Sequence, residues 1–229
     1  MTRPLFLLLF ILLTGLAPGA SAAPAQKDWS RSVTLTAEGA HLIGNPAAKT
    51  RLVEYVSYTC PHCAHFVAEG SEPLRKGWVS RGGVATEIRN LVRDRFDLTA
   101  AILARCGGPA RFQSVHEAIF AAQDSWLASV RAYASAPTTL PVDATRVELI
   151  TDIAQKTGLF ALLAKKGVAA EKSRACLADE KAMGIVLGMT KRGMGEDHVT
   201  GTPSFLINGT LTDAHDWAGL RALLPAPVN

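Results

Sequence analysis

Two cysteines separated by two residues, in the segment Cys60-Pro61-His62-Cys63, are the residues best suited to chemistry. At the N-terminus of a helix such a pair can close a small disulfide ring. The helix end then stabilises a thiolate on Cys60 through its backbone N–H groups and its dipole. Cys63, one turn further along, is expected to be shielded and to act as the resolving thiol, while a protonated His62 would lower the pKa of Cys60 further. A stabilised thiolate favours the reduced state, so the oxidised pair would be a strong disulfide donor.

The same spacing occurs in zinc sites, which need two further ligands. The remaining cysteines, Cys106 and Cys176, stand alone and far apart, so the sequence holds no second close pair. We therefore expect a redox pair, with no metal and no cofactor. A purely structural disulfide between Cys60 and Cys63 is the other alternative.

The elements around the pair fit this placement. Residues 51–57 are rich in β-branched and aromatic types, which predicts a strand directly before Cys60. A helix and a second strand at 84–92 complete a strand–helix–strand unit. The chain then turns helical from about 97 to 195 and returns to strands near its end. The pattern predicts an α/β sheet domain interrupted by a helical insertion, with a loop over 37–46 and a helical segment over 169–193.

The N-terminal residues have the form of a secretory signal peptide. Arg3 is followed by an apolar run over 5–13 and by Ala20-Ser21-Ala22, which predicts cleavage after Ala22 and a mature domain over 23–229. The run is shorter than the roughly 20 residues of a membrane span, although an uncleaved anchor is an alternative. Export to the periplasm, or secretion, is therefore expected. The basic residues are scattered, with a net charge of +4, so no nucleic-acid partner is expected.

Two segments resemble the DsbA-like thioredoxin-fold proteins. Residues 54–63 (EYVSYTCPHC) are similar to their active-site segment, and residues 201–209 (GTPSFLING) to their cis-proline loop and hairpin. The resemblance covers about residues 33–224 and implies a thioredoxin-like fold with a helical insertion between the two halves of the sheet domain. It also implies that Cys60 is the nucleophile, that Cys63 is the buried thiol and that Pro203 is the cis-proline. The backbone of Thr202, before it, would offer strand-like hydrogen bonds to a substrate chain.

Glu54 lies six residues before Cys60 in a strand that should be apolar on both faces if it is an inner strand. The family resembled has an acidic residue at this offset, associated with proton transfer at the inner cysteine. A buried carboxyl with a raised pKa can take the proton of Cys63. The alternative is a solvent-facing glutamate on an edge strand.

Cys106 and Cys176 fall in two separate helices of the expected insertion. They form either a structural disulfide that joins these helices or two buried free thiols. An oxidising compartment favours the disulfide.

These features favour an oxidase that donates the Cys60–Cys63 disulfide to unfolded or newly exported cysteine-containing proteins. The resemblance implies a membrane-bound DsbB-type partner that reoxidises the pair. An isomerase, or a reductase for a dedicated client, is an alternative because Thr before the cis-proline also occurs in isomerase relatives. Such isomerases usually carry a dimerisation domain, for which the stretch before Val33 leaves no room. A chaperone or binding module with an idle disulfide is the non-enzymatic alternative.

Overall fold

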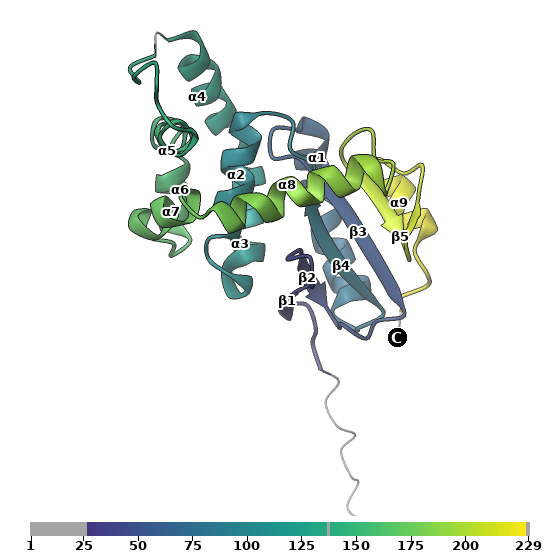
Figure 1. Ribbon diagram of the computed structural model, residues 1–229. Coiled ribbons are helices and arrows are strands. Elements are labelled where there is room, and N and C mark those ends of the chain that lie inside the picture. Colours follow the sequence, from purple (N-terminus) through teal and green to yellow (C-terminus); the bar gives the residue numbers. More distant parts are fainter. Residues whose placement is uncertain (1–26, 137, 228–229) are drawn as a thin grey trace, which may run out of the picture.

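The computed structural model describes residues 27–136 and 138–227, and the expected signal peptide, 1–22, lies outside them. The centre of the fold is a sheet with the strand order β1-β2-β4-β3-β5-β6 (Figure 1). Neighbouring strands are antiparallel except β3 and β4, which are parallel. The strands are β1 (Val33–Leu35), β2 (His41–Gly44), β3 (Thr50–Val56), β4 (Val84–Asn90), β5 (Ser204–Ile207) and β6 (Thr210–Leu211).

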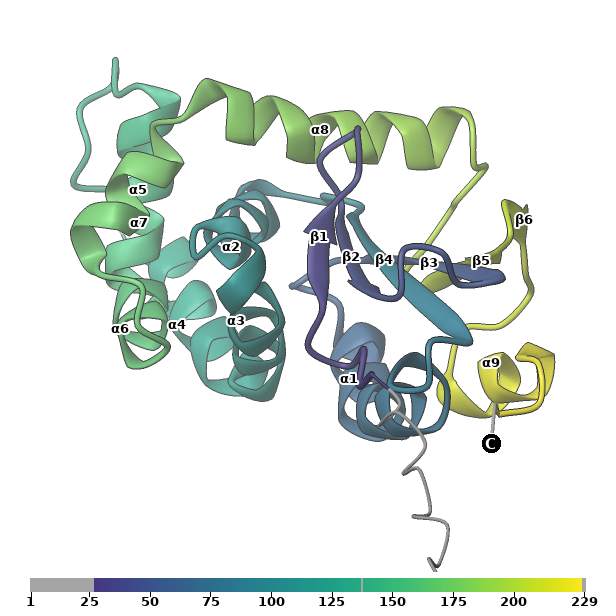
Figure 2. The same cartoon turned by 90° about the horizontal axis from the view of Figure 1, so that it is seen from below.

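Helices cover both faces of this sheet. Figure 2 shows α8 (Glu180–Gly195) on one face, and α1 (Pro61–Leu74) and α9 (Trp217–Leu223) on the other. Pro73 lies inside α1, where it removes a backbone donor. The helix continues directly as a wider π-helical segment, η1 (Arg75–Val79).

The helical insertion lies between β4 and β5, close to the range expected from the sequence. Figure 1 shows α2 to α7 gathered beside the sheet, with α8 leading back across it. Its helices are α2 (Arg95–Arg105), α3 (Pro109–Ala121), α4 (Gln123–Ser135), α5 (Arg146–Lys156), α6 (Leu159–Lys165), α7 (Ala170–Leu177) and α8. The α/β thioredoxin-like fold with a helical insertion, expected from the sequence, is thereby confirmed.

The insertion and the sheet domain share one continuous apolar core. Phe66 on α1 packs against Phe205 on β5, with ring centroids 4.7 Å apart. The same core extends into the insertion through Phe112, Ile119 and Trp126, each of which is at most 3% exposed. Burial of large side chains across the junction makes the insertion an integral part of the fold.

A disulfide joins Cys106, directly after α2, to Cys176 in α7, with their Cα atoms 5.8 Å apart. The sequence left open whether these residues are bridged or free, and in the structure they are bridged. The two cysteines are 70 residues apart in the chain. Closing a loop of this length stabilises the folded state by about 4 kcal/mol in the chain-entropy model.

Two local expectations were wrong. Residues 41–44, expected within a loop, form β2 between β1 and β4. The helical segment expected over 169–193 is divided into α7 and α8 at Ala178. The division occurs because the side chain of Asp179 accepts hydrogen bonds from the backbone N–H groups of Lys181 and Ala182, and so caps a new helix.

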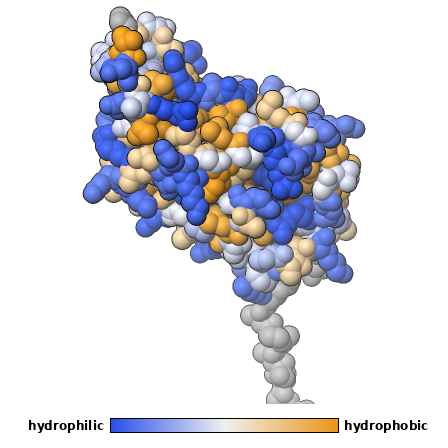
Figure 3. Space-filling view, viewed as in Figure 1, coloured by the Kyte–Doolittle hydropathy of each residue, from blue (hydrophilic) through white to orange (hydrophobic). Residues whose placement is uncertain are grey.

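The surface over α8 is largely hydrophilic, with apolar side chains gathered near the middle of that face (Figure 3). Leu187 and Met194 on α8 are among the exposed large apolar residues. Within 27–136 and 138–227, no helix has the length and apolar character that crossing a membrane requires.

Candidate functional site

Cys60 lies at the start of α1, directly beyond the end of β3. It is the N-cap residue, with extended backbone angles of φ −92° and ψ 118°, and Pro61 follows at the first helical position. Proline is well suited to this position because its missing N–H would have no partner inside the helix and its φ is already helical. The sequence therefore begins the helix at Cys60 and directs the first backbone N–H groups towards it.

The two thiols of the pair have opposite acidities. Cys60 is 3% exposed and Cys63 is fully buried, and both are free cysteines. A hydrogen bond from the Cys63 thiol is the largest cause that lowers the pKa of Cys60, to about 5, and the backbone N–H groups of Cys63 and His62 contribute further. Burial raises the pKa of the Cys63 thiol far above its ordinary value. At neutral pH the reduced pair therefore carries one thiolate, on Cys60, and one thiol.

His62 contributes to this arrangement through its backbone. Its N–H group lowers the pKa of Cys60, while the residue as a whole is exposed at the start of α1. The expectation from the sequence was that a protonated imidazole would lower the pKa of Cys60 further, in addition to the helix start. In the structure the contribution comes from the amide at the helix start, as expected for an anion at a helix N-terminus.

The loop before β5 faces the cysteine pair. The Thr202–Pro203 peptide bond is cis, and Sγ of Cys60 lies 3.1 Å from the carbonyl oxygen of Thr202. The Thr202 hydroxyl is buried, and its interaction with the Cys60 sulfur lowers the pKa of Cys60. The carbonyl oxygen of Pro203 accepts a 2.9 Å hydrogen bond from Nδ1 of His215. The structure thus brings Cys60, Cys63, Thr202 and Pro203 together.

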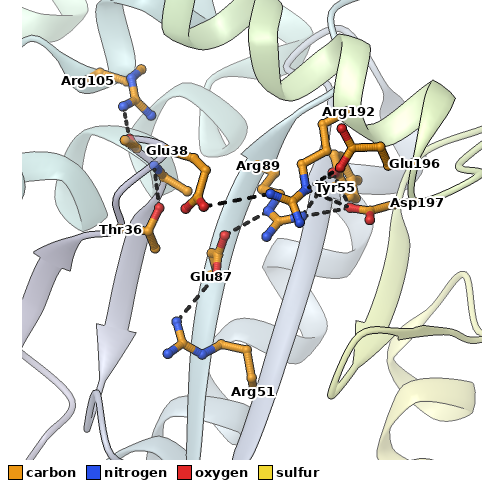
Figure 4. Close-up of polar contacts among 12 residues, drawn as sticks. Thr36, Glu38, Arg51, Tyr55, Glu87, Arg89, Arg105, Arg192, Glu196 and Asp197 are labelled. Carbon is orange, nitrogen blue, oxygen red and sulfur yellow. Dashed lines mark hydrogen bonds and ion pairs between the residues drawn. The ribbon is translucent and has the colours of Figure 1, made fainter.

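A charged network anchors the chain between α8 and this loop (Figure 4). Asp197 accepts hydrogen bonds from the Tyr55 hydroxyl, at 2.6 Å, and from Nη1 of Arg89, at 2.7 Å. Nε of Arg89 also donates to Glu87 at 2.7 Å, and Arg51 donates to the same carboxylate at 3.3 Å. The network ties the residues that precede Thr202 to the inner strands β3 and β4.

Glu54 lies in β3, which is flanked by β4 and β5, and it is 3% exposed. The alternative of an exposed glutamate on an edge strand is therefore wrong. Burial raises the pKa of Glu54 to about 8, so the carboxyl is largely neutral at pH 7. No hydrogen bond joins Glu54 to Cys63 within the described residues.

A cavity of about 40 Å³ lies beside Glu54, between the sheet, α1 and α3. Thr86 and His116 also line it. Oε1 of Glu54 and Oγ1 of Thr86 are buried, and neither has a hydrogen-bond partner in the described part of the chain. A cavity of this size has room for water, which would satisfy these two oxygens.

The sequence did not predict a polar cluster that lies next to Cys60. Asp97 on α2 accepts hydrogen bonds from the Ser57 hydroxyl, at 2.6 Å, and from the backbone N–H of Tyr58, at 2.7 Å. Arg93 donates to the hydroxyl oxygens of Ser57 and Thr59, each at 3.0 Å. Asp97 is three residues after Asp94, the N-cap of α2, so its position in the first turn of the helix could be predicted from the sequence. Its contact with a loop 40 residues earlier could not.

The second cysteine pair lies away from this site. The Cys106–Cys176 disulfide lies in the insertion, between the end of α2 and α7. Within 27–136 and 138–227, no group of three or more His, Cys, Asp or Glu side chains is placed to hold a metal ion. The arrangement offers the chemistry of two thiols of unequal acidity beside the cis Thr202–Pro203 peptide bond.

Several known proteins resemble this chain in sequence or structure. A family model described as thioredoxin matches residues 36–226. A structure of a protein-disulfide isomerase from Novosphingobium aromaticivorans is 37% identical, covers 80% of this chain and 94% of its own, and superposes with a TM-score of 0.72. The structure of alpha-DsbA1 from Wolbachia pipientis is 19% identical over 82% of this chain and 90% of its own, with a TM-score of 0.65, and shows likeness of fold.

Curated relatives from Rickettsia carry the provisional name protein-disulfide oxidoreductase. The relative from Rickettsia bellii is 30% identical over 82% of this chain, and the one from Rickettsia conorii is 32% identical over 75%. The chain spans 64% and 54% of the lengths of these two relatives. The family model covers most of the chain, and the fold agrees with it. The chain therefore belongs to the thioredoxin family, with a helical insertion between β4 and β5.

Proposed function

We propose that the protein is an exported thiol–disulfide oxidoreductase that acts as an oxidase and donates the Cys60–Cys63 disulfide to client proteins. The observation that carries this proposal is the unequal acidity of the two thiols. The pKa of Cys60 is lowered to about 5, and burial raises that of Cys63. The reduced pair is stabilised by its thiolate, so transfer of the disulfide to a client with ordinary thiols is favoured.

The reaction proceeds in two exchanges at sulfur. A client thiolate attacks Sγ of Cys60, the Cys60–Cys63 bond breaks, and Cys63 leaves as a thiolate that takes a proton. A second client thiolate attacks the client sulfur of the mixed disulfide, and Cys60 leaves as a thiolate. The client loses two electrons and gains a disulfide, while the cysteine pair gains two electrons and takes up one proton, on Cys63.

Glu54 is suited to supply that proton. With a pKa of about 8 it is protonated at pH 7, and it can take the proton back when the pair is reoxidised. Glu54 and Cys63 both raise the pKa of the Tyr58 phenol, so both lie near this side chain. Because no hydrogen bond joins the carboxyl to Cys63 among the described residues, proton transfer requires an intermediate carrier, such as a water molecule between the two groups.

Turnover requires a second partner. Each client that is oxidised leaves the pair reduced, so a catalytic oxidase needs an oxidant that removes two electrons from it. We propose a membrane-bound, quinone-linked DsbB-type protein for this role, in the periplasm or an equivalent compartment. The N-terminal sequence and the Cys106–Cys176 disulfide support an oxidising location.

A disulfide isomerase is the second candidate function. The relative from Novosphingobium aromaticivorans, at 37% identity, is described as a protein-disulfide isomerase. An isomerase needs the same nucleophile, Cys60, to attack a client disulfide from the reduced pair. The two functions therefore share the site and differ in the redox state in which the pair begins the reaction.

Trapping of the mixed disulfide tests the shared chemistry. Cys63→Ala lacks the resolving thiol and should accumulate mixed disulfides with exported cysteine-containing proteins, whereas Cys60→Ala should accumulate none. Non-reducing electrophoresis followed by mass spectrometry identifies the adducts and the cysteine that carries them. Equal trapping by the two variants would show that the roles of Cys60 and Cys63 are assigned wrongly.

Two client reactions separate the candidate functions. The oxidised protein should introduce a disulfide into a reduced, unfolded two-cysteine client in a stoichiometric burst. The reduced protein should be much slower at restoring activity to a client with scrambled disulfides. If the reduced protein restores the scrambled client and the oxidised protein fails to oxidise the reduced one, the isomerase is the correct function.

A further inference from the structure

The segment that carries the nucleophile, Ser57–Cys60, is held by two side chains of the helical insertion. Oδ1 of Asp97 accepts a 2.7 Å hydrogen bond from the backbone N–H of Tyr58. Nε2 of Gln123 donates to two carbonyl oxygens, that of Tyr58 at 2.8 Å and that of Cys60 at 3.0 Å. Both peptide-bond groups of Tyr58 are therefore paired with the insertion.

These two side chains are themselves fixed. Asp97 is 1% exposed and sits in the first turn of α2, where its second carboxylate oxygen also accepts from the Ser57 hydroxyl. Gln123 is 3% exposed and is the first residue of α4, at the junction with α3. Buried polar groups without partners are costly, so the two side chains and the loop stabilise one another in this one arrangement.

Gln123 has a particular weight in this arrangement. It is the only hydrogen-bond partner of the Tyr58 carbonyl oxygen among the described residues, whereas the Cys60 carbonyl oxygen also accepts from the Ala64 N–H at 3.2 Å. The Cys60 N–H in turn donates to the carbonyl oxygen of Ser57 at 3.1 Å. The orientation of the Cys60 residue is thus set on both sides of its Cα atom.

This orientation determines how the sulfur meets the helix start. The thiolate of Cys60 is stabilised by the Cys63 thiol and by the backbone N–H groups of His62 and Cys63. Hydrogen bonds of this kind weaken steeply when donor and acceptor are misaligned. A small rotation of the Cys60 backbone would therefore cost thiolate stability even if the helix itself stayed intact.

We propose that Asp97 and Gln123 are positioning residues, through which the helical insertion sets the acidity of Cys60. The helical insertion then contributes residues to the active site, in addition to packing beside it. The proposal rests on the proposed function in taking Cys60 as the nucleophile. Its test measures the acidity of Cys60, so it does not depend on finding a client.

The main test is the variant Gln123→Leu, which keeps a similar volume and removes both donors. The pKa of Cys60, measured from the thiolate absorbance of the reduced protein, should rise by about one unit or more. The matched control is Thr157→Val, which removes a buried 2.7 Å hydrogen bond to the Ile153 carbonyl oxygen elsewhere in the insertion. The control should lower the melting temperature and leave the pKa of Cys60 unchanged.

A pair of variants at Asp97 gives an independent measurement. Asp97→Asn and Asp97→Leu both remove the charge, but only Asn keeps an oxygen that can accept from the Tyr58 N–H. The pKa of Cys60 should therefore be higher in Asp97→Leu than in Asp97→Asn. The comparison separates loss of the acceptor from loss of the charge. It also decides the matter if Gln123→Leu does not fold.

The outcomes are distinct. The proposal is overturned if Gln123→Leu lowers stability but leaves the pKa of Cys60 equal to that of the control, or if the two Asp97 variants give the same pKa. If the variants shift the pKa as expected while the wild-type protein donates no disulfide to any client, the proposed function fails and the positioning role stands. If clients are oxidised but the variants leave the pKa of Cys60 unchanged, the proposed function stands and the positioning role fails.

Discussion

Replacing Glu54 by Gln should stabilise the protein, and the gain should depend on pH. The carboxyl is 3% exposed in β3, and burial raises its pKa from 4.5 to about 8. In the unfolded chain the group ionises near its ordinary pKa, whereas in the folded protein it holds its proton. Above pH 4.5 the unfolded state therefore binds fewer protons, and the folded state loses stability as the pH rises towards 8.

The difference between the two pKa values corresponds to roughly 5 kcal/mol above pH 8 and about 3 kcal/mol at pH 7. Below pH 4 both states are protonated and the term vanishes. Glu54→Gln cannot ionise, so its free energy of unfolding should exceed that of the wild type by more at pH 7 than at pH 4, by about 3 kcal/mol. Any cost of placing the amide in the cavity adds equally at both pH values and cancels in this comparison.

The assay is urea unfolding at a series of pH values from 4 to 8, with the Cys60–Cys63 pair kept in the same redox state in both proteins. Glu171→Gln, an exposed position in the first turn of α7, controls for the change of charge itself. A gain that is the same at pH 4 and pH 7, or a loss that grows with pH, would show that Glu54 is ionised in the folded protein and would refute the reasoning.

Two further predictions concern the other parts of the site. The double variant Cys106→Ser/Cys176→Ser should lower the free energy of unfolding by about 4 kcal/mol, because it opens a 70-residue loop. It should leave the pKa of Cys60 unchanged. A shift of that pKa in the folded double variant would show that the disulfide is part of the redox site. Thr202→Val keeps the shape of the side chain but removes the buried hydroxyl, so titration of the thiolate absorbance should give a higher pKa for Cys60. An unchanged pKa would mean that the hydroxyl does not act on the sulfur.

The local parts of the site were predictable from the sequence because they are encoded by neighbours in the chain. The strand before Cys60, the proline at the helix start and the spacing to Cys63 all lie within residues 50–63. Glu54 was identified by its contrast with a strand that should be apolar. The structure then settled what the pattern left open, since it places β3 between two other strands.

The contacts that cross from the insertion were not predictable. Asp97 and Gln123 reach a loop 39 and 65 residues earlier in the chain, and neither residue type stands out in a helical segment. The same holds for Asp197, whose partners Tyr55 and Arg89 are on other elements. Strand β2 was missed because its partners are β1 and β4, and pairing rather than local propensity makes it a strand.

The central claim, that Cys60 is a thiolate while Cys63 keeps its proton, is tested most directly by the reduction potential of the pair as a function of pH. With one thiolate and one thiol in the reduced form, the two-electron couple takes up one proton, so the potential should fall by about 30 mV per pH unit between about pH 6 and 7.5. At pH 7 it should lie roughly 60 mV above that of the same pair with ordinary thiols. A fall of about 59 mV per pH unit over the same range would mean that both thiols keep their protons, and would contradict the account.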